Sequence, residues 1–343
     1  MCCRYFILFL FCACFRHAYG ESAIAGCDKS ADAKKLTLTG SSLPAIRHIN
    51  DMKITGDTLW FVYETEGGYG QRFLRRAIID SKNLTLNVGP EMGHKGDGYY
   101  VSYMPYPVNN CDSTCLVVSQ DDGEIYSAEN DSVLSRTKKY IFSDGSSLPF
   151  PLSQYVQDVS MVAPDKFVFI GREPNGGTQY ALKANITTAQ VDTIRRIQLS
   201  PELTSWMSNA GELAYSRLHD RLAFAYRLHP IIEIFGMDGK LVKQVRICED
   251  TFNPATLNEA DFEDLNPLHI VDIATTPNFL YALHWNFKYA DAEDTAPTIF
   301  KIDWNGNIVD RLFNVPMPLY KIAVTDNHSI LGWNGKDFIS LNF

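Results

Sequence analysis

Four acidic residues stand at the same place in four similar stretches of the sequence. They are Asp51 in "INDMKI", Asp158 in "VQDVSM", Glu212 in "AGELAY" and Asp272 in "IVDIAT". Each stretch reads as the beginning of a short strand. If these strands surround one axis, their carboxylates could ring the mouth of a central channel, where oxygen ligands would suit Ca²⁺. The same oxygens could instead accept hydrogen bonds from backbone N–H groups at the strand ends.

Such a ring needs something that relieves the repulsion between its like charges. Two carboxylates about 8 Å apart repel by on the order of 2 kcal/mol at an effective dielectric constant near 20. When the stretch "PLYKIA" is aligned with the four others, Tyr320 takes the acidic position and Lys321 follows it directly. We therefore expect bound Ca²⁺, a basic neighbour such as Lys321, or raised carboxyl pKa values.

The elements that would position these residues are repeated strand pairs. Residues 230–246 and 297–313 both contain an alternating apolar run, then Asp-Gly or Asn-Gly, then a second alternating run. This pattern predicts a β-hairpin. Comparable hairpins are expected at 73–89, 123–137 and 180–197, and another strand pair precedes each hairpin. The sequence contains six such units, about 50 residues apart, which is typical of a repeat architecture.

Six units of four antiparallel strands predict an all-β fold, a six-bladed β-propeller that spans residues 34–343. The last unit holds three strands, and we expect the N-terminal strand at 34–40 to complete it and close the ring. Residues 248–269 form an acidic insertion between the fourth and fifth units. The only helical turn expected lies at 200–213, with Ser200 as its N-cap.

Residues 1–20 have the features of an export signal, a signal peptide or a lipoprotein leader, and residues 21–33 read as a linker. Three processing sites remain open. Cys14 follows a small residue at the end of the apolar run and is the candidate for lipidation. The tripeptide "AYG" at 18–20 would suit a signal peptidase, and "IAGC" offers Cys27 as a second lipobox.

Few of the other residues suggest chemistry. Cys111 and Cys115 in "CDSTC" could close a small disulfide loop, but they lack the second Cys or His pair that structural zinc requires. The eight histidines are dispersed, and we expect His219 and His229 on the surface or in turns, without a ligand role. The sequence contains no G-x-S-x-G, H-E-x-x-H or Walker motif.

Net charge further restricts the function. The chain of 343 residues carries a net charge of −9, and its Lys and Arg residues do not cluster. Because nucleic-acid binding depends on clustered cations that neutralise phosphates, a nucleic-acid partner is excluded.

The later hairpins resemble a known group of proteins. The stretches "IIEIFGMDGKLVKQV", "FLYALHWNFK", "IFKIDWNGNIVDRLF" and "LYKIAVTDNHSILGW" resemble the TolB-like six-bladed propellers that are common in Bacteroidetes envelopes. The resemblance is strongest over 210–343 and weaker over 45–200. It implies an exported protein, often a lipoprotein, mostly without an assigned function, and it transfers no catalytic residues.

Two functions from different classes follow. The first is a noncatalytic binding or scaffold propeller, which recognises an envelope protein or glycan through its blade loops and channel mouth. Such a protein would be located in the periplasm or attached to the membrane by a lipid anchor. The alternative is a calcium-dependent lactonase-type hydrolase or lyase that uses the acidic ring. Lactonase-type propellers also use asparagine ligands and a histidine base, which we could not locate here. Trp285, Trp304 and Trp333 are expected as buried blade anchors.

Overall fold

The computed structural model describes residues 29–30, 32–66, 72–92, 105–108, 115–119, 125–129, 133–138, 157–172, 177–185, 187–188, 190–257, 261–313 and 315–342. The leader with Cys14, and also Cys27 and Cys111, lie outside these residues. Cys115 belongs to a described strand, but its side chain is not described. Lipidation and the disulfide loop therefore stay predictions.

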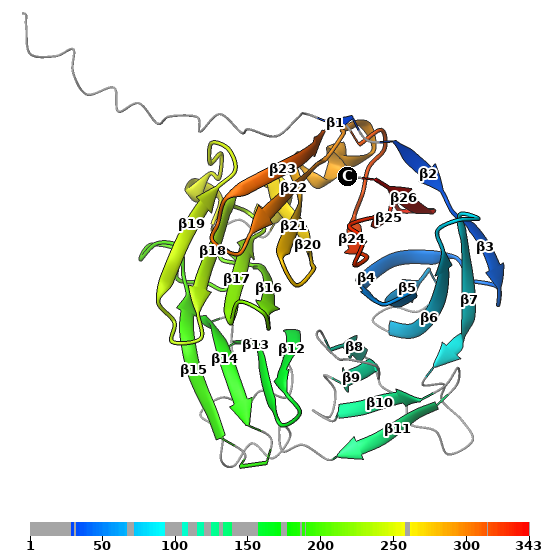
Figure 1. The fold of residues 1–343 in the computed structure, drawn as a ribbon. Coiled ribbons are helices and arrows are strands. Elements are labelled where there is room, and N and C mark those ends of the chain that lie inside the picture. Colours follow the sequence, from blue (N-terminus) through cyan, green and yellow to red (C-terminus); the bar gives the residue numbers. More distant parts are fainter. Residues whose placement is uncertain are drawn as a thin grey trace, which may run out of the picture.

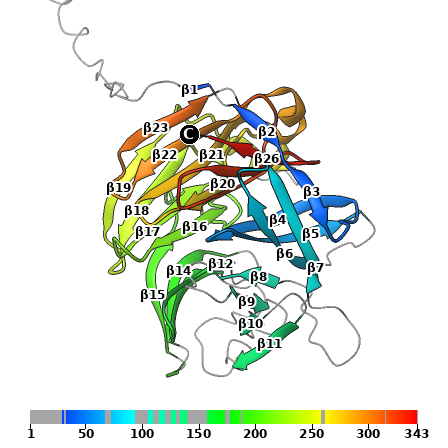
Figure 2. The same cartoon turned by 45° about the vertical axis from the view of Figure 1, so that its right-hand side comes forward.

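The strands of the described residues form six sheets arranged around a central axis (Figures 1 and 2). In each sheet consecutive strands pair antiparallel. The sheets consist of β4 (Ile46–Thr55), β5 (Thr58–Thr65), β6 (Arg72–Asp80) and β7 (Thr85–Met92); β8 (Pro105–Pro107), β9 (Cys115–Ser119), β10 (Ile125–Glu129) and β11 (Val133–Lys138); β12 (Gln157–Ala163), β13 (Lys166–Arg172), β14 (Gln179–Asn185) and β15 (Gln190–Ile197); β16 (Gly211–Ser216), β17 (Arg221–Tyr226), β18 (Ile231–Gly236) and β19 (Leu241–Arg246); β20 (Leu268–Thr275), β21 (Phe279–Phe287), β22 (Thr298–Asp303) and β23 (Ile308–Phe313); β24 (Lys321–Val324), β25 (Ile330–Trp333) and β26 (Phe338–Leu341).

The first strand of each sheet lies nearest the axis. The contacts run from β4 to β8, β12, β16, β20 and β24 in turn, and β24 contacts β4 again. This arrangement is a β-propeller with four-stranded blades, so the predicted all-β propeller architecture is confirmed. Five of the sheets are described with their side chains, and the sheet of β8–β11 almost entirely by its backbone.

The two hairpins with Asp-Gly and Asn-Gly turns are equivalent in the structure. Gly239, between β18 and β19, has φ +78°, and Gly306, between β22 and β23, has φ +83°. Only glycine adopts this left-handed backbone without strain. A Cβ atom on Gly239 would lie 2.1 Å from the Ile194 carbonyl oxygen, and one on Gly306 would lie 2.4 Å from Lys243 Cγ. Each turn therefore packs against the outermost strand of the preceding sheet.

The N-terminal segment differs from the single closing strand predicted at 34–40. Only β2 (Ala33–Lys35) pairs with β26, and β3 (Thr37–Gly40) pairs in parallel with β7 in the next sheet. Leu36 lies between them, 2% exposed, inside the apolar cluster that these two sheets share. Its burial directs the chain from one sheet to the other. In addition, β1 (Lys29–Ser30), inside the predicted linker, pairs in parallel with β23.

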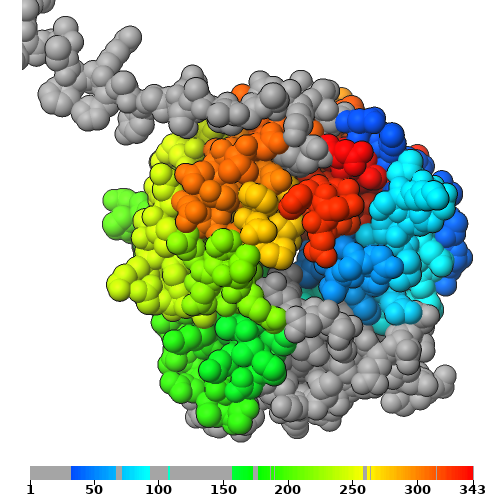
Figure 3. Space-filling view, in the orientation of Figure 1, coloured from blue at the N-terminus to red at the C-terminus, as the bar shows by residue number. Residues whose placement is uncertain are grey.

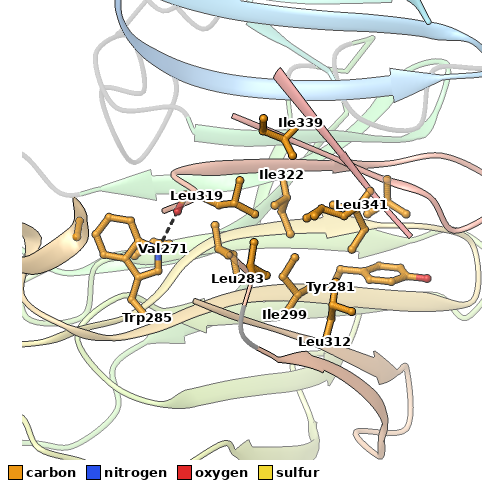
Figure 4. Close-up of a cluster of buried hydrophobic side chains, with 14 of the residues drawn as sticks. Val271, Tyr281, Leu283, Trp285, Ile299, Leu312, Leu319, Ile322, Ile339 and Leu341 are labelled. Carbon is orange, nitrogen blue, oxygen red and sulfur yellow. Dashed lines mark hydrogen bonds between the residues drawn. The ribbon is translucent and has the colours of Figure 1, made fainter. Parts of the chain in front are cut away.

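The apolar core lies between neighbouring sheets rather than at the axis. One cluster joins the sheet of β20–β23 to that of β24–β26 and contains Leu283, Ile299 and Ile322 (Figure 4). Within it, the Trp285 indole Nε1–H donates to the Leu319 carbonyl oxygen at 2.8 Å. As predicted, the three tryptophans that we singled out, Trp285, Trp304 and Trp333, are buried.

The connections hold little helix. Residues 200–210 form turns instead of the predicted helical turn, because the buried Asn209 amide Nδ2–H₂ donates to the carbonyl oxygens of Leu203 and Ser205. The insertion 248–269 does join β19 to β20, and it carries a 3₁₀ turn (η3, Pro254–Thr256) and a short helix (α1, Phe262–Leu265). Among the described residues, no helix is both long and apolar enough to cross a membrane.

Candidate functional site

The four predicted acidic residues do lie along the central channel. Asp51, Asp158, Glu212 and Asp272 come from β4, β12, β16 and β20, and together with Lys321 they line a narrow cavity of about 130 Å³. This placement follows from the repeat, since each residue holds a similar position on the innermost strand of its sheet. The sequence register was therefore sufficient to bring these four side chains together.

Three of the carboxylates link each innermost strand to the next one around the ring. Asp158 Oδ2 accepts from the Leu213 N–H at 2.8 Å. Glu212 Oε2 accepts from the Ile273 N–H at 3.0 Å, and Asp272 Oδ2 accepts from the Ile322 N–H at 2.6 Å. In every case the carboxylate of one sheet binds an amide in the following sheet. These acids therefore stabilise the contact between blades, and they do not cap their own strands.

The same pattern corrects the alignment of the last unit. The amides that receive these bonds belong to residues 213, 273 and 322, which directly follow Glu212, Asp272 and Lys321. Lys321, rather than Tyr320, therefore occupies the acidic register in the sheet of β24–β26. The alignment was wrong by one residue because it had only the short stretch "PLYKIA" to match.

Lys321 supplies the positive charge that the ring requires. Its Nζ lies 2.7 Å from Asp272 Oδ1 and 3.0 Å from Glu212 Oε1. Burial alone would lower the pKa of this ammonium group, but the two carboxylates outweigh burial and raise it. Lys321 therefore stays protonated and neutralises the centre of the channel.

The carboxyl groups respond differently to their surroundings. Burial, together with the Glu212 charge, raises the pKa of Asp158 to about 7. Burial also raises the pKa of Asp272, against the opposing effect of Lys321. For Glu212, burial is outweighed by Lys321 and Arg227, which lower its pKa. Near neutral pH the ring therefore holds the Lys321 ammonium group and the Glu212 carboxylate, whereas burial favours the protonated forms of Asp158 and Asp272.

The negative charge of Asp51 is compensated by a different cation, Lys53. Its Oδ2 lies 2.9 Å from Lys53 Nζ, and the same ammonium group donates to the Pro107 carbonyl oxygen of β8. This pair again joins one sheet to the next. Lys53 was not recognised from the sequence, although its position two residues after Asp51 places both side chains on one face of a strand.

The channel widens into a second cavity of about 870 Å³. Asn50, Asp158, Glu212 and Lys321 line both cavities, so the two adjoin each other. The wide part, which we call the mouth cavity, also has basic and aromatic residues on its wall, among them Arg47, Arg72, Arg227, Trp285, Tyr289, Tyr320 and Lys336. Figure 3, viewed along the axis, shows a hollow at the centre of the ring.

One side of the mouth cavity is an aromatic cluster. The ring of Tyr320 lies 5.3 Å from that of Trp285 and 6.2 Å from that of Tyr289, measured between centroids. Tyr289 belongs to a 3₁₀ turn (η4, Tyr289–Asp294) between β21 and β22 and is 57% exposed. Its ring is therefore available to stack on a ligand. None of these residues was predicted as a site, because the loop that places Tyr289 at the channel mouth has no distinctive motif.

The donor set in the channel does not fit calcium. Ca²⁺ takes six to eight oxygen ligands around one point. Among the described residues, the channel carboxylates do not form a group of three or more whose oxygens converge, and the oxygens of Glu212 and Asp272 already bind Lys321 and backbone amides. We therefore derive no catalytic step through a calcium ion.

Comparisons with known proteins identify the fold. The chain resembles the crystal structure of a DUF4221 family member from Bacteroides vulgatus, with a TM-score of 0.57, 10% identity, and coverage of 92% of this chain and 97% of that one. It also resembles a protein from Bacteroides fragilis inferred to be exported, with a TM-score of 0.53, 11% identity, and coverage of 92% and 95%. No family model and no curated protein matches the chain. At these identities the likeness shows a β-propeller fold.

Proposed function

We propose that this chain is a noncatalytic binding propeller of the bacterial cell envelope, which recognises an envelope glycan or protein through its blade loops and mouth cavity. The observation that carries this proposal is the use of the channel acids: they bind neighbouring strands and Lys321. Groups that hold the ring together are not free to activate water. The mouth cavity, by contrast, has the size of a ligand site.

The wall of the mouth cavity suits an acidic saccharide. Five of its residues are cationic and three are acidic, although the whole chain carries a net charge of −9. The cations are Arg47, Arg72, Arg227, Lys321 and Lys336, and the acids are Asp158, Glu212 and Glu293. Arg72 is already paired with Glu64, and Lys321 with Glu212 and Asp272. The remaining cations of the wall can attract anionic ligands, and exposed aromatic rings such as Tyr289 provide apolar contact area for sugar faces.

The finer architecture and location belong to the same proposal. We infer a six-bladed, TolB-like ring in which β2 completes the sheet of β24–β26. We also infer that residues 1–20 direct export and that the mature protein is periplasmic or held by a lipid on Cys14. The alternative function, a calcium-dependent lactonase-type hydrolase, predicts bound Ca²⁺ and lactone turnover.

The binding function is tested by variants of the mouth cavity. The chain is applied to arrayed acidic and neutral envelope glycans, and to periplasmic extract, as wild type and as Tyr289→Ala combined with Lys336→Glu. Lys240→Glu, in the exposed β18–β19 turn away from the cavity, serves as the matched control. We expect a bound ligand that the double variant loses and the control retains. Equal binding by all three proteins, or calcium-dependent lactone hydrolysis, would overturn the proposal.

A further inference from the structure

A second group of polar side chains lies where the insertion 248–269 begins, and none of its members lines either cavity. Cys248 follows β19, His269 belongs to β20 and His284 belongs to β21. Among the described residues, this is the one group of three or more Cys, His, Asp or Glu side chains whose ligand atoms all lie within 4.8 Å of one another. We call it the Cys-His-His cluster.

The distances within the cluster match those of a metal coordination shell. Cys248 Sγ lies 3.6 Å from His284 Nε2 and 3.9 Å from His269 Nδ1, and the two imidazole nitrogens are 3.5 Å apart. With Zn–N bonds of about 2.0–2.1 Å and Zn–S bonds of about 2.3 Å, a tetrahedral site separates two nitrogens by about 3.3 Å and nitrogen from sulfur by about 3.6 Å. The nitrogen pair is too far apart for a good hydrogen bond, but it fits one edge of such a tetrahedron.

The backbone holds the two imidazoles in this position. β20 and β21 pair antiparallel, with Ile270 opposite His284, and their register shifts between Leu268 and Ile270. His269 occupies this irregular position, and its ring stacks beside that of His284 at 5.7 Å. His269 is completely buried and His284 is 7% exposed. Rings held this tightly lose little further freedom when a ligand binds.

Burial keeps the two imidazoles neutral. Burial lowers the pKa of His269 to about 4, and that of His284 to about 4. Neutral imidazole is the form that coordinates metals. His269 Nε2 lies 3.4 Å from Thr251 Oγ1, so an Nε2–H that donates to this hydroxyl would leave the Nδ1 lone pair directed at the cluster.

We propose that Cys248, His269 and His284 bind one Zn²⁺ ion, with the fourth coordination position taken by water or by an external ligand. A sulfur and two imidazole ligands suit zinc better than calcium or magnesium, which prefer oxygen. Cys248 is half-buried, so the site opens to solvent on its side. The bound ion would fasten the start of the insertion to β20 and β21.

Binding must displace the thiol proton. Burial and the nearby Asp250 charge raise the pKa of Cys248, so the metal-free sulfur is protonated at neutral pH. Zinc binds the thiolate, and each ion bound therefore releases one proton to solvent while the S–H bond is replaced by an S–Zn bond. Affinity should fall as the pH is lowered.

The test uses the mature chain, stripped of metal and purified without a histidine tag. Zinc is titrated calorimetrically and by competition with a chromophoric chelator, and Co²⁺ replaces zinc in a parallel absorption experiment. We expect one equivalent of bound zinc and a thiolate-to-cobalt charge-transfer band. Since the loss of an outer-shell partner alone weakens metal sites by about 10–100-fold, Cys248→Ser should weaken binding by at least about 100-fold, and Thr251→Ala by about 10-fold.

Two controls separate this site from other ligands. His219→Gln changes an exposed histidine, and Cys111→Ser with Cys115→Ser removes the two cysteines of "CDSTC"; both variants should bind zinc as the wild type does. No saturable zinc binding by the wild type would overturn the proposal, as would binding that Cys248→Ser leaves unchanged or binding of Cu⁺ alone. The cobalt spectrum of the wild type decides the matter even if a variant fails to fold.

Discussion

Replacing Asp158 by asparagine should stabilise the protein, and the effect should grow with pH. Asparagine retains an oxygen that can accept the Leu213 N–H, but it carries no charge. Asp158 also has a left-handed backbone, with φ +54°, a conformation that asparagine tolerates better than most residues. Both features favour the variant.

The magnitude follows from the pKa of Asp158. Its pKa rises from an ordinary 3.8 to about 7, chiefly because the group is buried. At 1.36 kcal/mol for each tenfold change in proton affinity, ionisation of the folded wild type costs about 4 kcal/mol at most, and we expect Asp158→Asn to gain about 1–4 kcal/mol at pH 8. Between pH 4 and 7 the folded state binds more protons than the unfolded state. Wild-type stability therefore falls as the pH rises through this window, whereas the variant lacks this contribution.

The assay is urea unfolding of wild type and variant at several pH values between 4 and 8. The difference in the free energy of unfolding should be near its minimum at pH 4 and largest above pH 7. Asp326→Asn, at an exposed turn, is the matched control and should change little. A variant that is less stable than the wild type at pH 8, or a difference independent of pH, would refute this explanation of the acidic ring.

Three other predictions concern charge, packing and anchoring. Lys321→Met leaves Glu212 and Asp272 without their shared cation. In urea titrations it should lower the free energy of unfolding by about 3–5 kcal/mol at pH 8 and by less at pH 5. An equal loss at both pH values would argue against charge as the cause. Leu36→Ala should cost about 2–5 kcal/mol and the exposed Leu38→Ala much less, by thermal unfolding, whereas equal costs would contradict the account of the strand crossing. Cys14→Ser should move the protein from the membrane fraction to the periplasm by immunoblotting, and a wild type already wholly soluble would favour the signal-peptidase site.

Local sequence signals predicted much of the fold. The Asp-Gly and Asn-Gly turns with Gly239 and Gly306 need only a few neighbouring residues to specify a hairpin, and the repeat then places the acidic residues on innermost strands. The crossing at Leu36 was not predictable in this way. Its direction depends on an apolar cluster that joins residues of β5, β7 and β26, which are distant in sequence.

The contacts between sheets could not be predicted from the sequence either. The Asp158 carboxylate binds an amide 55 residues further on, and nothing near either residue marks the other. The same holds for the Cys-His-His cluster, whose members lie on different elements and meet through a register shift. His229 was expected on the surface or in a turn. It does lie in the bend between β17 and β18, but it is buried, because residues of the insertion cover it: Asp250 lies 2.9 Å from its Nδ1, and the Phe252 ring packs against its ring at a tilt.

The most direct test of the central claim is a calorimetric titration of the metal-free wild-type protein with Ca²⁺ at pH 7.5, alongside Asp158→Asn combined with Asp272→Asn. If the channel acids hold the blades together and Lys321 neutralises them, neither protein should show saturable calcium binding, and millimolar Ca²⁺ should not raise the melting temperature of either. Stoichiometric calcium binding by the wild type that the double variant loses would contradict the account and favour the calcium-dependent hydrolase.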